Sequence, residues 1–460
     1  MKKLLFLLFI GSIPIFAASF SNTGIENNSL PLHCSNIKSF FSQGITSGHL
    51  RNFFMSTINK ESLQDYFANA TGGAISYHTM TFKGFKFGVK GIFTFLTASN
   101  DLHFRDPISG KHAKFEIQLF DIYRPQEKYD LDRLEELYFK YSNNGFRIVY
   151  GRQTIKNPLL HPRDGRMKPF VFSGLRTQKQ WKKSQLEVTW INSVSPRSTT
   201  HFYTIEKALS LENRGYNSDG TITNLQNTVS TKGLGYFAFE YKGLKHHFKV
   251  FNFLLENINN TIWLESLSKF KGYKLGLQYV FQSALEKQNN SGQYFSEPDK
   301  YIHIISTRIE RNHLDFTGSL NATTAVGNGI FNFPRSLARE SLFTSMALFW
   351  LEGKGRVSVA NLNLKWQPHF IHNKALNAEI KIGQLYGLNS DEPSYNRYLE
   401  KNSRQYNLCL EYDFQNTLEG LKLKCIYIKN HLTNSEIVEL DRDFNRNNFH
   451  HFQFITNIEF

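Results

Sequence analysis

The last eleven residues of the chain, HHFQFITNIEF (450–460), limit its possible fold more than any other segment. They alternate between an apolar and a polar face, and the final residue is itself aromatic. The apolar face holds Phe452, Phe454, Ile458 and Phe460 with Thr456, and the polar face holds Gln453, Asn457 and Glu459. Such a final strand is typical of an outer-membrane barrel. The alternative is a half-buried strand of a soluble sheet.

The same alternation recurs along most of the chain. Each alternating segment carries charges or glycine on its second face, and no helical-period segment lies between them. The segments are close to ten residues long, the length that crosses a bilayer at a tilt. A single such strand is also expected in a soluble sandwich, so their number and length favour the membrane. Examples are 85–95, 137–142, 273–281, 376–383 and 407–414.

Composition agrees with this interpretation. The mean hydropathy is only −0.40, yet the chain has 42 Phe and 21 Tyr. A transmembrane barrel has low average hydropathy because its two faces cancel. We therefore predict an all-β fold, a transmembrane antiparallel β-barrel. Tight turns at 83–84 and 142–145 alternate with long loops expected at 57–72 and 98–132, as in barrels with short periplasmic turns.

The strand count is ambiguous in one region. Counting from the two ends disagrees by one strand between residues 340 and 375. Single-chain bacterial barrels have even strand numbers, so we expect eighteen strands, with sixteen as the fallback.

The N-terminus has the features of a secretory signal peptide. Lys2 and Lys3 precede an apolar run that is too short to span a bilayer, and Ala17 offers a small residue for cleavage. We expect a signal peptide at 1–17, a periplasmic lead-in at 18–45 and the barrel at 46–460. The chain is therefore expected outside the cytoplasm, as an integral protein of the bacterial outer membrane.

Charge and cysteine content limit the partners. The formal net charge is +15, but the basic residues are spread over strands and loops, which argues against nucleic acid. They suit anionic solutes in a lumen and lipopolysaccharide phosphates outside, or serve solubility alone.

Cys409 and Cys425 flank a short turn, where either a cross-strand disulfide or two separate thiols is possible.

Two segments resemble the OprD-like outer-membrane porin family. They are 48–79, with its RNFFM strand, and 132–175, with LEELYFKYS, GRQ-x-I-x-x-P-L and DGRM-x-P. The terminal Phe is shared as well. The resemblance implies an eighteen-stranded monomeric barrel whose third loop, about 156–169, folds inward to narrow the pore. It also implies passage of small solutes, often carboxylates such as amino acids, along basic side chains.

The third loop and the strand before it supply the candidate pore constriction. Its charged residues are Arg152, Arg163, Asp164, Arg166 and Lys168. In a low-dielectric constriction, guanidinium groups bind carboxylates strongly, and a row of weak sites still releases them. Asp164 would prevent anion trapping. The same residues could instead attach the loop to the wall through salt bridges.

Three wall residues need separate treatment. Strict alternation in FRIVYGRQ places Arg152 on the outward face with Tyr150, unless Gly151 marks a bulge that changes the register. Lys140 and Arg147 lie on the lumen-facing parity and are expected to line the wall.

Catalysis has little support in the sequence. No nucleophile elbow, zinc-protease motif or phosphate loop occurs, and the His pairs lack metal-ligand spacing. We expect neither cofactor nor metal and no enzyme activity. The prediction is a porin for small hydrophilic, carboxylate-bearing solutes, contacting lipid and lipopolysaccharide as a monomer. The alternatives are an envelope scaffold with a closed pore and a soluble secreted β-protein.

Overall fold

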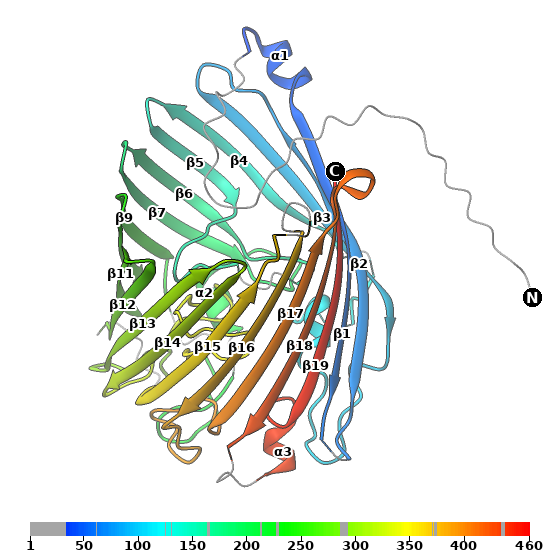
Figure 1. Cartoon of the computed structure of the whole chain (residues 1–460), viewed down its shortest axis with the longest axis vertical. Coiled ribbons are helices and arrows are strands. Elements are labelled where there is room, and N and C mark those ends of the chain that lie inside the picture. Colours follow the sequence, from blue (N-terminus) through cyan, green and yellow to red (C-terminus); the bar gives the residue numbers. More distant parts are fainter. Residues whose placement is uncertain are drawn as a thin grey trace, which may run out of the picture.

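The structure is a computed structural model that describes residues 34–460, except 61, 125, 130, 163–165, 212–213, 227–229, 286–292, 370, 372–374 and 434–437. It is a closed barrel of 18 antiparallel strands, which confirms the predicted fold (Figure 1). The described residues form a 19-stranded sheet, but the two-residue β8 pairs only with β7, which also pairs directly with β9. Pairing of β1 with both β2 and β19 closes the ring.

The strands of the ring follow one another in chain order. Their bounds are β1 (Ile45–Ile58), β2 (Tyr66–His78), β3 (Phe85–Ser99), β4 (Arg133–Asn143), β5 (Phe146–Gln153), β6 (Val171–Gln180), β7 (Ser184–Ser195), β8 (Tyr203–Thr204), β9 (Leu234–Lys242), β10 (His246–Leu255), β11 (Asn259–Phe270), β12 (Tyr273–Ala284), β13 (Tyr301–His313), β14 (Phe316–Gly327), β15 (Val357–Trp366), β16 (Leu376–Tyr386), β17 (Ser403–Asp413), β18 (Leu421–Leu432) and β19 (Phe449–Glu459).

Five short helices accompany the strands in the described residues. They are α1 (Ile37–Ser42), η1 (Glu116–Leu119), α2 (Ile205–Ser210), η3 (Asn416–Leu418) and α3 (Leu440–Asp443). No helix in the described part of the chain is both long and apolar enough to cross a membrane.

The connections distinguish the two ends of the barrel. At the turn end, β1 begins, β19 ends and short turns join the strands, while most connections at the loop end are long (Figure 1). In chain order we number the loop-end connections loop 1 (59–65), loop 2 (100–132), loop 3 (154–170), loop 4 (196–233), loop 5 (256–258), loop 6 (285–300), loop 7 (328–356), loop 8 (387–402) and loop 9 (433–448).

Two sequence-based expectations about the connections need correction. The long loop expected at 57–72 is only 59–65, because β1 and β2 both continue further than their apolar patterns suggest. The extra strand counted between residues 340 and 375 is absent from the described residues there, because loop 7 (328–356) contains no strand. Eighteen strands, the preferred count, is therefore confirmed.

The outer face of the wall is apolar. Side chains of the expected apolar faces, such as Phe139, Leu277 and Ile380, are exposed on the outer surface. Aromatic pairs lie near both ends of the strands: Phe85–Tyr141 and Phe316–Trp366 at the turn end, Tyr427–Phe452 and Tyr301–His303 at the loop end. Such aromatic girdles mark the two interfaces of a membrane.

The inner face is not uniformly polar, contrary to the simple alternation expected from sequence. In the loop-end half of the barrel, inward side chains and loop residues form two apolar clusters. The larger contains Phe253 and Trp263 of the wall, Leu209 of α2 and Leu342 of loop 7. The smaller packs loop 2 and Met167 of loop 3 against the seam strands. The lumen therefore contains a hydrophobic core that holds loops.

Only part of the N-terminal region is described. The expected signal peptide at 1–17 lies outside the described residues. Of the lead-in, α1 lies at the turn end, where the Phe40 carbonyl accepts a hydrogen bond from Met80 N at 3.1 Å (Figure 1). Cys409 and Cys425 are free thiols on opposite faces of the wall, because Cys425 pairs with outward-facing Leu410.

Candidate functional site

Loop 3 crosses the lumen and reaches the strands at the seam. Arg51 of β1 donates a hydrogen bond from Nη1 to the backbone carbonyl of Arg166. On β2, a Cβ added at Gly72 would clash first with the Phe93 carbonyl oxygen of β3 and would lie 3.1 Å from Met167 Cε, so the glycine allows both the neighbouring strand and loop 3 to come close. Because loop 3 leaves the wall between β5 and β6, contacts with β1 and β2 require it to run through the interior.

Arg133, at the start of β4, attaches two loops to the wall. Its Nη2 donates to the Pro169 carbonyl of loop 3 at 2.9 Å, and its Nη1 donates to the Thr199 carbonyl of loop 4 at 3.1 Å. The same guanidinium bonds Ser195 Oγ at 2.9 Å and forms an ion pair with Glu135 at 3.0 Å. A planar guanidinium with five donors can satisfy several acceptors at once, which suits it to this role.

Loop 7 also folds into the lumen, where two glutamines of β12 hold its backbone. Gln278 accepts from Phe343 N at 3.0 Å and donates to the Ser341 carbonyl at 3.3 Å. Gln282 accepts from Asn332 N at 2.8 Å and donates to its carbonyl at 3.0 Å. A side-chain amide thus replaces the partner that the loop backbone would have in a sheet.

Loops 3 and 7 meet inside the barrel. Ser341 of loop 7 donates to the Pro158 carbonyl of loop 3 from both N and Oγ, at 2.8 and 3.0 Å. His161 and Arg339 form an isolated β-bridge nearby. The two loops leave the wall nearly half a ring apart, since loop 3 follows β5 and loop 7 follows β14. Their contact therefore bridges the lumen between two distant parts of the wall.

Ion pairs between inward-facing residues line a large part of the wall. In three of them the carboxylate is buried, with 0 to 8% of its side chain exposed, while the cation keeps about a quarter exposed. The N–O distances are 2.8 to 2.9 Å. The pairs are Lys90–Glu135, Arg176–Glu187 and Lys249–Glu265. The charge presented to the lumen at these positions is therefore positive.

The buried carboxylates are held in place by further donors. Glu187 accepts from Arg176 Nε at 2.8 Å and Nη2 at 3.0 Å, from Gln178 at 2.6 Å, and from the Tyr236 hydroxyl. Glu265 accepts from Gln278, which in turn binds loop 7. These donors hold each carboxylate in one position, so each acid in turn fixes the position of its cation.

The residues predicted from sequence do not all face the lumen in the structure. Lys140 and Arg147 lie on the inward parity of β4 and β5, as expected. Arg152 lies on the outward parity with Tyr150, and β4 and β5 pair without a register shift, so Gly151 does not turn it inward. Its guanidinium stacks 4.2 Å from the Phe202 ring and donates to the Leu134 carbonyl. Arg163 and Asp164 lie outside the described residues.

Arg166 and Lys168 are enclosed by protein. Arg166 is 3% exposed and lies 5.9 Å from the Phe53 ring, and Lys168 is fully buried. Burial, together with the nearby positive charge of Arg133, lowers the pKa of Lys168 from its usual 10.5 to about 7. Neither side chain presents its charge to open solvent, and both lie in the stretch that Arg51 and Arg133 attach to the wall.

Sequence reasoning missed the ion pairs and loop 7. Lys90 and Glu135 both occur in segments recognised as strands, with Lys90 on the polar face. Their pairing depends on strand register, which alternation alone does not fix. Loop 7 was missed because ESLFTSMALFW (340–350) is apolar enough to resemble a strand.

These features define a class of protein: a closed 18-stranded β-barrel with an apolar outer band, whose lumen is narrowed by loops folded in from one end. No protein-family model and no curated protein sequence matches the chain.

Solved structures of this class are similar to the chain. Acinetobacter baumannii OccAB4 is 14% identical with a TM-score of 0.68, covering 90% of this chain and 97% of that one. Pseudomonas aeruginosa OccK9 (OpdG) is 12% identical, TM-score 0.69, covering 92% and 100%. Pseudomonas aeruginosa OpdK, solved with vanillate, is 13% identical, TM-score 0.65, covering 92% and 99%. The resemblance to OprD-like porins is thus confirmed at the level of the fold.

Proposed function

We propose that the protein is an outer-membrane porin for the passive uptake of small hydrophilic solutes that carry a carboxylate. The observation that carries this proposal is the asymmetry of three wall ion pairs, Lys90–Glu135, Arg176–Glu187 and Lys249–Glu265, whose acids are buried and whose cations face the lumen. The apolar outer band and the aromatic girdles support a place in the membrane. The same fold in OpdK, crystallised with the carboxylate vanillate, is compatible with this solute class.

A wall of tethered cations suits transport better than tight binding. Each cation keeps its buried acid partner, so an entering carboxylate shares the cation instead of neutralising a free charge. The attraction is stronger than in bulk water because the lumen is narrow and bounded by a low-dielectric wall. Several weak sites in a row admit an anion and also release it.

The predicted site residues fall into four groups in this proposal. Lys140 and Arg147 belong to the lumen wall with the cations of the ion pairs. Arg166 and Lys168 act in the inner structure of loop 3, whose backbone Arg51 and Arg133 hold. Arg163 and Asp164 are proposed at the constriction on sequence grounds alone. Arg152 acts outside the lumen.

The proposal also covers the molecules that the barrel contacts in the outer membrane. The protein contacts solutes inside and outer-membrane lipid and lipopolysaccharide outside, functions as a monomer, and binds no nucleic acid. No catalytic step is proposed for it.

Single-channel current under a salt gradient tests the proposal. Refolded protein in a planar phospholipid bilayer should give discrete steps with an anion-selective reversal potential. Lys249→Gln should move that potential toward cations, because it leaves Glu265 as the local charge. The pair replacement Lys249→Gln/Glu265→Gln should largely restore the original value, and Lys38→Gln on exposed α1 serves as the control.

The outcomes separate the alternatives. A folded barrel that gives no steps would leave the scaffold function instead. Steps whose selectivity does not respond to Lys249→Gln would keep the porin and remove the wall cations as its selectivity determinant.

A further inference from the structure

A group of basic side chains lies on the outer, apolar face of the barrel near the loop end. Arg404 of β17, Lys429 and His431 of β18, and His450 of β19 share the outward parity of Leu408 and Phe452. Arg404 and His431 are exposed, and Lys429 and His450 are half-buried. We call these four residues the outer basic patch.

Strand register makes the patch continuous. Arg404 is directly opposite His431, and Lys429 is opposite Tyr406 on one side and His450 on the other. Directly opposed residues have Cβ atoms roughly 5 Å apart, so the four side chains are near neighbours. Among the residues that the structure describes, the outward strand positions around them carry no carboxylate; these positions include Gln384, Tyr386, Tyr406, Tyr427 and Phe452.

The patch has positive charge without an internal counter-charge. Arg404 donates to Gln384 Oε1 at 2.6 and 3.0 Å, His431 contacts Asn448 at 2.9 Å and His450 contacts the Tyr427 hydroxyl at 2.7 Å. Every one of these partners is neutral. The Lys429 side chain has neither a hydrogen bond nor an ion pair among the described residues. Cations on a lipid-facing wall are unfavourable unless an anion accompanies them.

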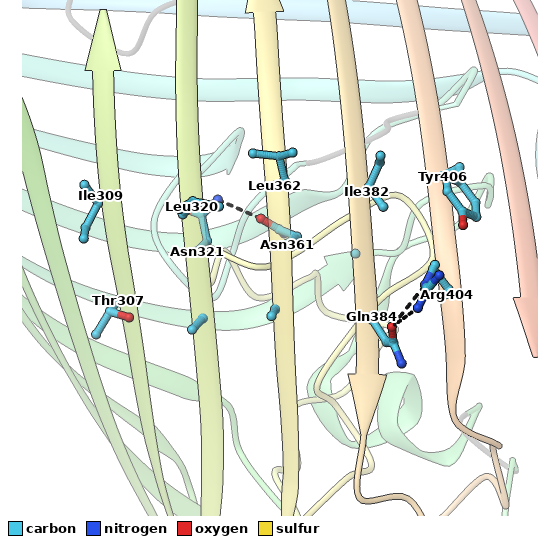
Figure 2. A pocket seen from close by; sticks show the side chains of 13 residues that line it. Thr307, Ile309, Leu320, Asn321, Asn361, Leu362, Ile382, Gln384, Arg404 and Tyr406 are labelled. Atoms are coloured by element: carbon cyan, nitrogen blue, oxygen red, sulfur yellow. Dashed lines mark hydrogen bonds between the residues drawn. The ribbon is translucent and has the colours of Figure 1, made fainter. Parts of the chain in front are cut away.

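A hollow in the outer wall adjoins the patch. Ala322 and Ala360 are directly opposed on β14 and β15, and their small side chains leave a depression of about 700 Å³. Its apolar sides are Ile309, Leu320, Leu362 and Ile382 (Figure 2). The hydrogen-bonded Arg404 and Gln384 form its polar edge on the side nearer the loop end (Figure 2).

We propose that this surface binds lipopolysaccharide, with a lipid A phosphate on the outer basic patch and an acyl chain in the hollow. The proposal rests on the proposed function in one respect, the placement of the barrel in the outer membrane. Long loops face the outside in such barrels, so the loop end lies in the outer leaflet, where lipopolysaccharide is found. Guanidinium and ammonium groups bind phosphate through charge-assisted hydrogen bonds, and the hollow matches a saturated chain.

Lipid retention in native mass spectrometry tests the proposal. The folded barrel in a neutral detergent is titrated with bisphosphorylated lipid A, with the dephosphorylated form and with phosphatidylglycerol. Wild-type protein should retain bisphosphorylated lipid A in preference to both others. Arg404→Gln/Lys429→Gln should weaken that retention about tenfold or more, since two charge-assisted contacts are lost.

A matched control removes two positive charges from the opposite end. Arg311 is outward-facing and exposed near the turn end, beside Tyr273, and Lys271 lies in the neighbouring turn. Arg311→Gln/Lys271→Asn should retain lipid A as the wild type does. In a third variant, Ala322→Phe/Ala360→Phe should fill the hollow and reduce retention even of lipid with intact phosphates.

Each contrary result has a defined meaning. Equal loss in both charge variants, or equal retention of the dephosphorylated lipid, overturns the phosphate site. Equal retention of phosphatidylglycerol overturns lipopolysaccharide as the occupant. The heat-dependent gel shift verifies that every variant is folded. Current in phospholipid bilayers is measured separately, so a barrel that binds lipid A without conducting would reject the porin and keep this site.

Discussion

Lys168 is the most unusual single residue of the inner structure. It is fully buried, and its Nζ has no hydrogen-bond partner among the described residues. The charged groups around it are mixed: Arg133 opposes its protonation, while Asp121, Glu135 and Asp132 favour it. Burying an ammonium without a direct partner costs folding free energy, so this lysine destabilises the barrel at neutral pH.

We predict that Lys168→Met stabilises the barrel in a pH-dependent way. Because the folded-state pKa is lowered to about 7, the unfolded chain binds more protons between about pH 7 and 10.5, and stability rises with pH there. Methionine should therefore raise the unfolding free energy at pH 6 by on the order of 2–4 kcal/mol, and by much less at pH 10. Urea unfolding followed by the gel shift measures this.

The exposed Lys38→Met on α1 should change little at either pH and serves as the control. A gain of the same size for Lys168→Met at pH 6 and pH 10 would show that better packing, and not the removed charge, is responsible.

At the residue level, alternation predicted facing but not burial. It placed Lys140 and Arg147 inward and left Arg152 ambiguous, and the structure gives Arg152 the outward parity of strict alternation. It could not foresee that Lys168 is enclosed, because that depends on how loops 2, 3 and 4 come together. Such contacts join residues far apart in sequence.

Among the elements, loop 7 contributes most to the inner structure. Its apolar side chains join the larger inner cluster, while Gln278 and Gln282 satisfy its backbone. From the sequence, the strand count between residues 340 and 375 was ambiguous, and part of loop 7 is an apolar segment there. An apolar side chain is shielded from water equally well by lipid outside the barrel or by a core inside it. Composition alone therefore could not distinguish a lipid-facing strand from a loop packed in the lumen.

Removing the two glutamine amides should release loop 7. Gln278→Leu/Gln282→Leu abolishes four hydrogen bonds to the loop backbone. At about 1 kcal/mol each, the docked position should lose roughly 2–4 kcal/mol. We expect larger and noisier single-channel currents. Gln367→Leu, in a turn-end connection, should leave the current unchanged.

Unaltered current in the double variant would mean that apolar packing alone holds loop 7. Loss of the folded gel band would point instead to a role in barrel assembly, and single replacements would then be compared.

For the whole molecule, closure of the ring depends on a tight seam. Gly48 of β1 lies under the Phe460 ring: a Cβ there would be 2.8 Å from two of its carbons and 2.9 Å from the Ala74 carbonyl oxygen. Phe460 N and the Gly48 carbonyl are 3.0 Å apart, and Gly48 N and the Phe460 carbonyl are 2.7 Å apart. The terminal aromatic residue is thus part of the closure.

Gly48→Val should destabilise the seam by about 1–3 kcal/mol, the usual cost of overpacking. We expect slower appearance of the compact gel band on refolding into vesicles. Gly318→Val on β14 is the matched control, because a Cβ at that glycine meets nothing within 4 Å. Equal rates for the two variants would show that β-propensity, not the contact with Phe460, decides the outcome.

The global architecture was the most predictable level. A period-two pattern repeated in segments of bilayer length allows few folds other than a barrel. The strand number was less certain, because the apolar segment in loop 7 could not be distinguished from a strand by its sequence. The inner core could not be predicted, because alternation describes which face a residue takes and not what that face meets.

The residues of the inner apolar core also affect the chain before the barrel has folded, because they make it prone to aggregate. In β10, the segment FKVFNFLL (248–255) has Phe248, Val250 and Leu254 facing outward and Phe251, Phe253 and Leu255 facing the core. A polar-lined barrel would have a charge or amide at most alternate positions. Here eight residues hold only Lys249 and Asn252 as polar members. Such windows self-associate when unfolded in water. The newly exported chain should therefore depend on a periplasmic chaperone until it inserts.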